Sequence, residues 1–264
     1  MRNPDLEAKL LLLECTSIQE KQFYSFPENK LSRAEEKRFY KLVSKRLMGT
    51  PLAYITGVKE FWSIPFTIFP GILIPRPETE LIVEKVLELS SRENETIVDI
   101  GTGCGNIAVS LAKELPQARI VATDTAMKAL KLAKSNASRQ KTNIIFARGS
   151  LFSALPRLRL EGKCDFIVSN PPYVSEEEWA KLDIEIRDHE PKSALVAGKS
   201  GLEVINKLIQ GAPPYLKPGG CLLVEIGIGQ RDKVLSFFDS GAVWKKVNFF
   251  RDLNGISRVA MGKT

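Results

Sequence analysis

Short apolar runs alternate with segments of helical periodicity along most of the chain, beginning near residue 79. The apolar runs cover residues 96–100, 119–124, 143–148, 164–170, 221–226, 246–251 and 256–261. Between them, apolar residues recur at helical spacing over residues 80–91, 106–114, 126–140, 202–216 and 229–238. Alternation of this kind predicts an α/β fold, with a largely parallel sheet covered by helices on both faces.

The last two apolar runs differ from the others because only residues 252–255 separate them. A crossover between parallel strands needs about a dozen residues or more, so these two strands must be antiparallel neighbours. Five parallel strands followed by this pair predict a seven-stranded sheet.

The first part of the chain has a different pattern and predicts two further units. Residues 1–56 are interpreted as a helical domain, because Ser32 and Glu35 have the spacing of a capping box, and Gly49 with Pro51 ends a helix. Residues 57–78 are apolar and aromatic but interrupted by prolines and a glycine, which indicates a β-hairpin linker. Residues 79–264 then form the α/β domain.

The composition is that of a globular protein. The chain has 264 residues, 44% hydrophobic and 26% charged, which is enough for one core and a small accessory domain. It contains no apolar stretch near the roughly eighteen residues of a membrane span, and its start lacks the basic segment of a signal peptide, so we expect a cytoplasmic protein. The four cysteines have no paired spacing and there is one histidine, which predicts buried thiols and no metal.

The charge is compatible with several partners and names none of them. The formal net charge is +7, and basic residues are concentrated between Arg33 and Arg46. The charge permits an RNA, DNA or ribosome-associated partner, and the local cluster is interpreted first as a solvated helix face.

A glycine-rich segment follows the first apolar run of the α/β domain. It reads Asp99-Ile100-Gly101-Thr102-Gly103-Cys104-Gly105-Asn106 and leads into an apolar helix. Glycines at such a place let the backbone turn tightly and approach a ligand closely at a helix N-terminus. The dinucleotide fingerprint requires its third glycine three residues after the second, but Gly105 follows Gly103 by two, so the NAD form fits poorly.

Asp124 ends the second apolar run, about twenty residues further on, where a carboxylate can accept both hydroxyls of a ribose. The alternative is that Asp124 caps the helix that follows. The glycine segment, Asp124 and Asn170 all follow parallel strands, and open α/β sheets bind ligands at that edge. We therefore expect these residues to share one cleft.

Residues 170–173 read Asn-Pro-Pro-Tyr and carry the most informative chemistry of the chain. An amide nitrogen is a poor nucleophile, so an enzyme that alkylates one must hold both of its N–H bonds. Asn170 Oδ1 and the Pro171 carbonyl can each accept one of them, on a backbone stiffened by Pro171 and Pro172. Tyr173 can cover the planar group or lie near a sulfonium cation. The alternative is a proline-stiffened turn.

With these motifs the chain resembles the PrmC/HemK family of protein-(glutamine-N5) methyltransferases, which modify peptide chain release factors. The resemblance covers nearly everything after the first thirty residues. Besides the glycine segment and residues 170–173, the matching runs are residues 51–57, 60–62, 74–80, 189–195 and 225–227 with Gln230. The glycine segment alone would indicate any class I methyltransferase, and residues 170–173 would also suit adenine-N6 enzymes. The run at 74–80 discriminates more.

The resemblance implies a class I, Rossmann-like methyltransferase domain that binds S-adenosyl-L-methionine and no metal. The implied cofactor-binding residues are Asp99, Gly101, Thr102, Gly103, Cys104, Gly105, Asp124, Ser150, Leu151 and Asn170. The implied catalytic residues are Asn170, Pro171 and Tyr173, and these residues together with Pro172 would bind the glutamine of a Gly-Gly-Gln motif. Ser150 departs from the family, which often has an acidic residue there.

Other polar residues have two interpretations each. Asp99 either reaches the ammonium of the donor or hydrogen-bonds at its strand end. Arg76 and the glutamates at 78 and 80 can close over the cofactor, or else Thr79 with these flanking carboxylates begins a helix. Glu190 with Pro191 either forms a wall for the substrate or is structural. Glu225 is interpreted as structural. His189 is interpreted as a loop residue bonded through its ring and not as a base, because methyl transfer to an amide needs none.

Two other functions remain open. An adenine-N6 nucleic-acid methyltransferase also needs two acceptors and an aromatic lid, but it predicts an added target-recognition region that is not evident here. A non-catalytic adaptor predicts a broken glycine segment or a lost Asn170, and both are intact. The expected partner is a release factor, bound by a monomer that has no membrane segment and no direct contact with nucleic acid.

Overall fold

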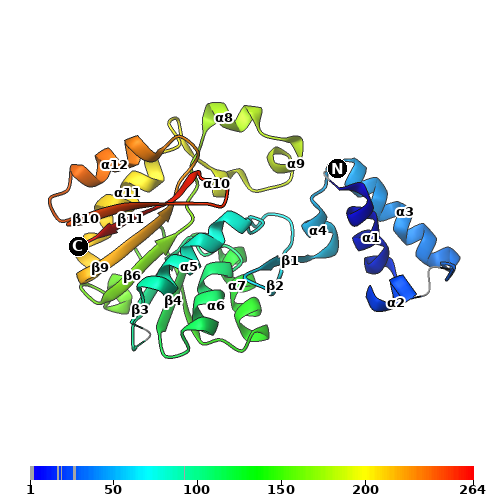
Figure 1. Ribbon diagram of the computed structural model, residues 1–264, viewed down its shortest axis with the longest axis horizontal. Coiled ribbons are helices and arrows are strands. Elements are labelled where there is room, and N and C mark those ends of the chain that lie inside the picture. The colour runs from blue at the N-terminus through cyan, green and yellow to red at the C-terminus, as the bar shows by residue number, and fades with distance from the viewer. Residues whose placement is uncertain (1–2, 17, 19, 26–27, 92) are drawn as a thin grey trace.

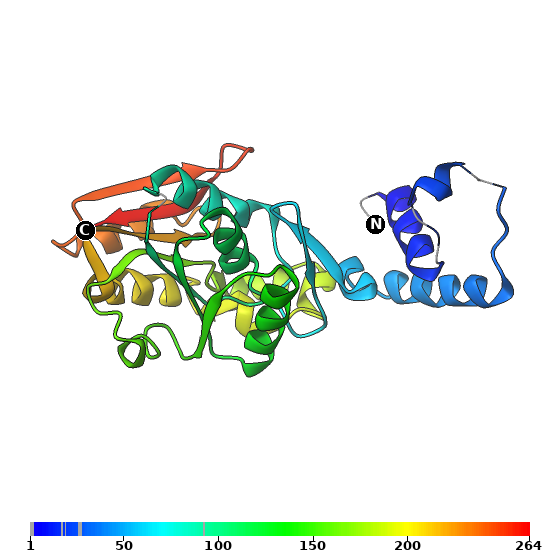
Figure 2. The ribbon, with the colours of Figure 1, turned by 90° about the horizontal axis from the view of Figure 1, so that it is seen from below.

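The computed structural model describes residues 3–16, 18, 20–25, 28–91 and 93–264, so residues 1, 2, 17, 19, 26 and 27 of the expected helical domain lie outside it. The chain is elongated: a group of N-terminal helices lies at one end, beside a larger α/β body (Figures 1 and 2). A hairpin lies between the two.

The N-terminal helices are α1 (Pro4–Cys15), α2 (Glu20–Ser25), α3 (Arg33–Leu47) and α4 (Leu52–Thr56). The capping box at the start of α3 is confirmed, because the Ser32 hydroxyl accepts from Glu35 N while the Glu35 carboxylate accepts from Ser32 N. Gly49, with a φ of +88°, turns the chain after α3. Leu11 and Cys15 of α1 are buried, so a small core holds these helices together.

The expected hairpin consists of β1 (Val58–Phe61) and β2 (Ile64–Thr67), which pair antiparallel. Trp62 and Ser63 form its two-residue turn, each with a φ of 54°. The hairpin is fastened to the α/β body by the buried side chain of Asn136. Asn136 Oδ1 accepts from Thr67 N at 3.0 Å, and Asn136 Nδ2 donates to the carbonyl of Cys104 at 2.9 Å.

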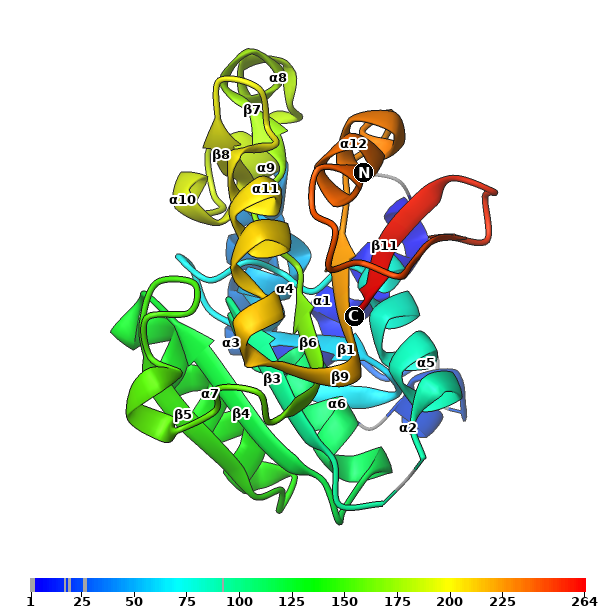
Figure 3. The same cartoon turned by 90° about the vertical axis from the view of Figure 1, so that its left-hand side faces the viewer.

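The sheet of the α/β body has seven strands in the order β10-β11-β9-β6-β3-β4-β5 (Figure 3). Its strands are β3 (Thr96–Ile100), β4 (Arg119–Asp124), β5 (Ile144–Arg148), β6 (Cys164–Ser169), β9 (Leu216–Glu225), β10 (Lys246–Arg251) and β11 (Ser257–Lys263). The neighbours from β9 to β5 are parallel, whereas β11 is antiparallel to both β9 and β10. The seven strands and the antiparallel last strand are therefore confirmed.

Helices cover both faces of this sheet, as the alternating pattern predicts. The helices are α5 (Glu80–Leu89), α6 (Asn106–Glu114), α7 (Met127–Arg139), α11 (Glu203–Gly211) and α12 (Arg231–Asp239), with short 3₁₀ turns η1 (Pro77–Thr79), η2 (Pro156–Leu158) and η3 (Pro213–Tyr215). One core layer packs α5, α6, α7 and the hairpin on the sheet, and the other packs α11 and α12. Because the central strands β3, β4, β6 and β9 are buried on both faces, their carboxyl ends are held rigidly.

An inserted segment between β6 and α11 was not predicted. It comprises β7 (Val174–Ser175), α8 (Glu176–Lys181), α9 (Ile184–Arg187), α10 (Lys192–Leu195) and β8 (Val196–Gly198), with β7 and β8 paired parallel. These elements are too short and too polar to show a period. Figure 1 shows α9 on the side of the body that faces the N-terminal helices.

Arg46 corrects the expectation of a fully solvated basic face on α3. Its side chain is buried, and its Nε donates to Glu7 of α1 at 2.7 Å while Nη1 donates to Glu185 of α9 at 3.0 Å. The other basic residues of this stretch, Arg33, Lys37, Arg38, Lys41 and Lys45, are exposed. Arg46 therefore joins the N-terminal helices to the inserted segment.

Within the described residues, no helix has the length and apolar character to cross a membrane.

Candidate functional site

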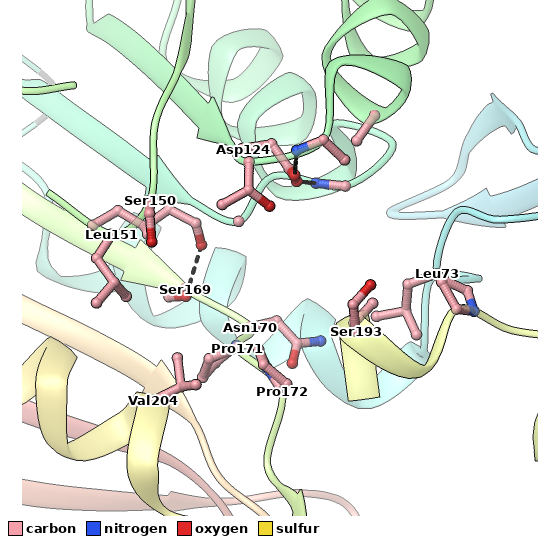
Figure 4. A pocket seen from close by; sticks show the side chains of 18 of the residues that line it. Leu73, Asp124, Ser150, Leu151, Ser169, Asn170, Pro171, Pro172, Ser193 and Val204 are labelled. Carbon is pink, nitrogen blue, oxygen red and sulfur yellow. Dashed lines mark hydrogen bonds between the residues drawn. The ribbon is translucent and has the colours of Figure 1, made fainter. Parts of the chain in front are cut away.

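A cavity of about 310 Å³ lies at the carboxyl ends of β3, β4, β5 and β6. Its walls come from the glycine segment, the ends of these strands, the residues after the hairpin, and α10 and α11. Figure 4 shows Asp124 on the opposite side of this space from Pro171 and Pro172, with Ser150 and Leu151 to one side and Leu73 and Ser193 to the other. The expected shared cleft therefore exists, and its size suits a nucleoside-containing ligand.

The glycine segment approaches this cavity with its backbone. Gly101 and Gly103 line it, both have positive φ angles of 76° and 56°, and a side chain at either position would meet open space. Gly105 has a different role: a Cβ there would come within 3.0 Å of the Ala133 Cβ on α7. The first two glycines thus leave room for a ligand, and the third allows α6 and α7 to pack closely.

Asp124 lines the cavity, and its carboxylate is held by backbone donors. Oδ2 accepts from Gly103 N at 3.0 Å and Oδ1 accepts from Ala126 N at 2.8 Å. The cap of α7 is Ala126, without a side-chain hydrogen bond, so the interpretation of Asp124 as a helix cap is wrong. A carboxylate has lone pairs beyond these two bonds, and they remain available to a ligand.

Asp99 is fully buried at the end of β3 and does not line the cavity. Its Oδ2 accepts from the Thr102 hydroxyl at 2.6 Å, while Oδ1 makes no hydrogen bond to a described residue. Burial raises the pKa of the Asp99 carboxyl to about 7. A buried acceptor without a partner, beside an open glycine loop, fits a ligand that carries a cation.

Thr102 and Cys104 belong to the loop but point away from ligand contact, because both are buried and neither lines the cavity. The Cys104 thiol has a pKa raised to about 12 by burial. Ser150 and Leu151, by contrast, line the cavity after β5, with Ser150 exposed. The predicted role of each of these residues toward the cofactor stays a prediction.

Residues 170–173 separate this cavity from a second one of about 20 Å³. Asn170, Pro171 and Pro172 line both, and Tyr173 lines the smaller. Asn170 Nδ2 donates to Thr79 Oγ1 at 2.9 Å, and the Tyr173 hydroxyl donates to Glu225 Oε1 at 3.1 Å. Among the described residues, no donor reaches Asn170 Oδ1 or the Pro171 carbonyl. Two acceptors are thus available where the cavities meet.

The sequence allowed both a functional and a structural role for Glu190, Glu80 and His189, and none of the three lines the larger cavity. Glu190 is buried and accepts from Ile74 N at 3.1 Å and from Arg76, so it fastens the inserted segment to the chain after the hairpin. Glu80 accepts from Trp62 N at 2.7 Å. His189 lines neither cavity and lies beside Gly49.

Some residues of the site carry no recognisable sequence signal. Thr79 was expected only as a helix start, yet its hydroxyl binds Asn170 and Glu225 instead of capping α5. Further residues that line the larger cavity without having been predicted are Gly71, Ile72, Leu73, Ser193, Ala194, Val204, Lys207 and Leu208. Apolar wall residues look like core residues in a sequence. No group of metal-ligating side chains occurs within the described ranges.

This sheet order, with its glycine loop, an acidic residue after the second strand and the acceptors at its edge, defines a class I S-adenosylmethionine-dependent methyltransferase. A methyltransferase from Pyrococcus furiosus shares the fold at 18% identity and a TM-score of 0.56, over 86% of this chain and 98% of that chain. TYW2 from M. jannaschii, solved in complex with AdoMet, is 15% identical with a TM-score of 0.50, over 78% of this chain and 84% of that chain.

The chain belongs to the release factor glutamine methyltransferase family. The release factor glutamine methyltransferase of Koribacter versatilis is 38% identical over 262 residues, which cover 99% of this chain and 91% of the relative. Residues 1–57 match the model of the PrmC N-terminal domain, and residues 77–186 match that of the methyltransferase small domain. The resemblance inferred from the sequence motifs is confirmed.

Proposed function

We propose that the protein transfers a methyl group from S-adenosyl-L-methionine to the side-chain amide nitrogen, N5, of the glutamine in the Gly-Gly-Gln motif of peptide chain release factors. The observation that carries this proposal is the pair of unpaired acceptors, Asn170 Oδ1 and the Pro171 carbonyl, at the junction of the two cavities. An amide NH2 has two hydrogens, and this site offers one acceptor for each.

The larger cavity is the proposed cofactor site. S-adenosyl-L-methionine supplies an electrophilic methyl carbon on a sulfonium when it is bound. Gly101 and Gly103 would bring backbone close to it, Asp124 would accept from its ribose, and the unpaired Asp99 Oδ1 supports a role toward its ammonium group. Leu151 would pack on its adenine, and Ser150 would hydrogen-bond to it.

Asn170 and Pro171 would orient the glutamine in the smaller cavity. Both acceptors pull on the N–H bonds, which raises the electron density on the nitrogen and aims its lone pair at the larger cavity. Pro171 and Pro172 keep this stretch stiff and have no N–H of their own to compete for an acceptor. The rate enhancement is then carried by orientation and electrostatics.

No side chain has to act as a base in this reaction. As the N–CH3 bond would form and the S–CH3 bond would break, S-adenosylhomocysteine would leave and the amide nitrogen would become positively charged. A nitrogen in that state is strongly acidic and loses one of its two hydrogens to solvent as a proton. The placement of His189 outside both cavities is consistent with this, because a general base must lie within hydrogen-bonding reach of its proton.

The proposal is tested with labelled S-adenosyl-L-methionine and three acceptors: a release factor, its variant with Gln replaced by Ala in the motif, and adenine-containing DNA. Label on the intact release factor alone is expected. Label on DNA and not on protein would instead identify an adenine-N6 methyltransferase.

Asn170→Ala tests the role of the acceptor. Transfer should be lost because the nitrogen is no longer held, while S-adenosylhomocysteine binding, measured by calorimetry, should remain largely intact. Asn254→Ala, on the exposed turn between β10 and β11, is the matched control and should leave both unchanged. Full transfer by Asn170→Ala would contradict the role proposed for this residue.

The partner and location follow from the substrate. We propose that the protein acts as a monomer in the cytoplasm on release factors, without direct contact with nucleic acid. The exposed basic residues of α3 are compatible with a docking surface for an acidic or ribosome-associated partner. They are equally compatible with a solvated helix face.

A further inference from the structure

A chain of buried hydrogen bonds lies behind Asn170. Asn170 Nδ2 donates to Thr79 Oγ1 at 2.9 Å, and Thr79 Oγ1 donates to Glu225 Oε2 at 2.6 Å. Thr79 and Glu225 are each 1% exposed, and neither lines the larger or the smaller cavity. They come from η1 and the end of β9, so two distant parts of the chain meet at this point.

The direction of these hydrogen bonds is set by the carboxylate at the end of the chain. An ionised carboxylate only accepts, so the single hydroxyl hydrogen of Thr79 must point to Glu225. The Thr79 oxygen can then only accept from Asn170, which requires the NH2 of the amide on that side. The carbonyl oxygen of Asn170 is consequently left for the cavity.

We propose, on the basis of the function proposed above, that Thr79 and Glu225 are positioning residues for methyl transfer. The buried carboxylate, acting through the hydroxyl, keeps the Asn170 amide turned so that its oxygen, and not its NH2, meets the NH2 of the substrate. An amide turned the other way would present donors to donors and could not hold the substrate nitrogen.

The same carboxylate also holds the other end of this motif. Glu225 Oε1 accepts from the Tyr173 hydroxyl at 3.1 Å, and Gln230 Nε2 donates to the Tyr173 carbonyl at 2.9 Å. Glu225 thus binds Asn170 through Thr79 and binds Tyr173 directly. One buried side chain fixes both ends of the acceptor segment.

The charge of Glu225 depends on pH. Burial raises its pKa to about 7, with Glu78 acting in the same direction, whereas the hydrogen bonds from Thr79 and Tyr173 and the charge of Arg258 oppose the rise. As the pH falls through this value the carboxyl gains a proton and can donate to Thr79. The hydroxyl is then free to donate to Asn170, so protonation permits the unproductive orientation of the amide.

Substitutions at Thr79 separate this role from a purely structural one. Thr79→Val keeps the shape but loses the hydroxyl, and we expect it to lower kcat about fivefold to tenfold, the effect of one lost hydrogen bond. The KM for S-adenosyl-L-methionine and the affinity for S-adenosylhomocysteine should stay unchanged. Thr79→Ser keeps the hydroxyl and should restore kcat. Equal kcat values for Thr79→Val and the wild type would overturn the proposal.

Amide hydrogen exchange gives a measurement that does not depend on activity. In protein carrying 15N in its asparagine side chains, the Asn170 NH2 should exchange slowly in the wild type and in Thr79→Ser, because Thr79 accepts from it. Exchange should be faster in Thr79→Val. Identical exchange in all three proteins would overturn the proposed orientation even if the wild type methylates release factors.

The pH profile tests Glu225 itself. When kcat of the wild type is measured from about pH 5 to about pH 9, it should decrease as the pH is lowered through the pKa of this carboxyl. Glu225→Gln and Thr79→Val should have lower kcat and lack this acid limb. If both variants kept the same decrease of kcat at low pH, another group would be its cause and the proposal would be overturned. A wild type that transfers nothing would instead defeat the proposed function, and the exchange measurement would still stand.

Discussion

Asp99 combines a buried ionisable group with a proposed role in ligand binding. It is enclosed at the end of β3 with one oxygen unpartnered, and burial raises its pKa to about 7 from the ordinary 3.8. The folded state therefore holds a proton that the unfolded state releases between these two values. Stability falls as the pH rises through this window, and the loss persists above it.

Asp99→Asn removes this ionisation. As the pH rises from about 4 to about 8, the wild type loses stability through this ionisation and the variant does not. Over this range we expect the unfolding free energy of the variant, measured by urea denaturation, to increase relative to that of the wild type by on the order of 3 kcal/mol. Its affinity for S-adenosyl-L-methionine should fall, because a neutral amide attracts a cation less. Asp239→Asn, at the exposed end of α12, is the control. A stability difference that does not change with pH would contradict the buried charge.

At the scale of elements, Asn136 of α7 joins two segments that are distant in sequence. Its amide hydrogen-bonds with β2 through Thr67 and with the glycine loop through the carbonyl of Cys104. It is 1% exposed, and its bond to the Cys104 carbonyl is buried, whereas those to the Thr67 backbone are partly buried. The hairpin is thus connected to the loop that shapes the cofactor site.

Asn136→Ala should cost about 3 kcal/mol of unfolding free energy, because it leaves buried backbone groups without partners. The affinity for S-adenosylhomocysteine should fall with it, since the glycine loop loses a support. Ser135→Ala, at the neighbouring exposed position of the same helix, should leave both unchanged. Wild-type stability of Asn136→Ala would mean that the hairpin is held by packing alone.

The strands and main helices were predictable from sequence because buried parallel strands give continuous apolar runs, and β3 and β4 match their predicted bounds. The inserted segment was not, since helices as short as α9 have no period. Asn170 could be recognised from its local chemistry. Thr79 and Glu225, 146 residues apart, could not be connected, because a contact between distant residues leaves no local pattern.

At the scale of the whole molecule, Arg46 ties the N-terminal helices to the α/β body. Its side chain is 8% exposed and lies between Glu7 of α1 and Glu185 of α9. Residues 1–57 match the PrmC N-terminal domain, and we expect a whole release factor to contact these helices as well as the cavities. The relative position of the two parts should therefore affect binding of the whole substrate more than the chemistry.

Arg46→Ala breaks a buried ion pair, which typically costs about 3–5 kcal/mol. We expect limited proteolysis to remove the N-terminal helices faster, and KM for a whole release factor to rise while kcat stays near that of the wild type. Arg38→Ala removes an ion pair with Glu14 in which the arginine is 57% exposed, and it should behave as the wild type. Equal cleavage of both variants would show that Arg46 does not join the two parts.

Cys104 belongs to the loop proposed to hold S-adenosyl-L-methionine, a strong alkylating agent, in every catalytic cycle. Thiolates attack such electrophiles far more readily than amides do, so an ionised sulfur in contact with this donor would itself be methylated. Burial keeps its pKa near 12, and the sulfur therefore retains its hydrogen at neutral pH. Its side chain is also buried and does not line the cavity, so at neutral pH the thiol is neither ionised nor in contact with a ligand held there.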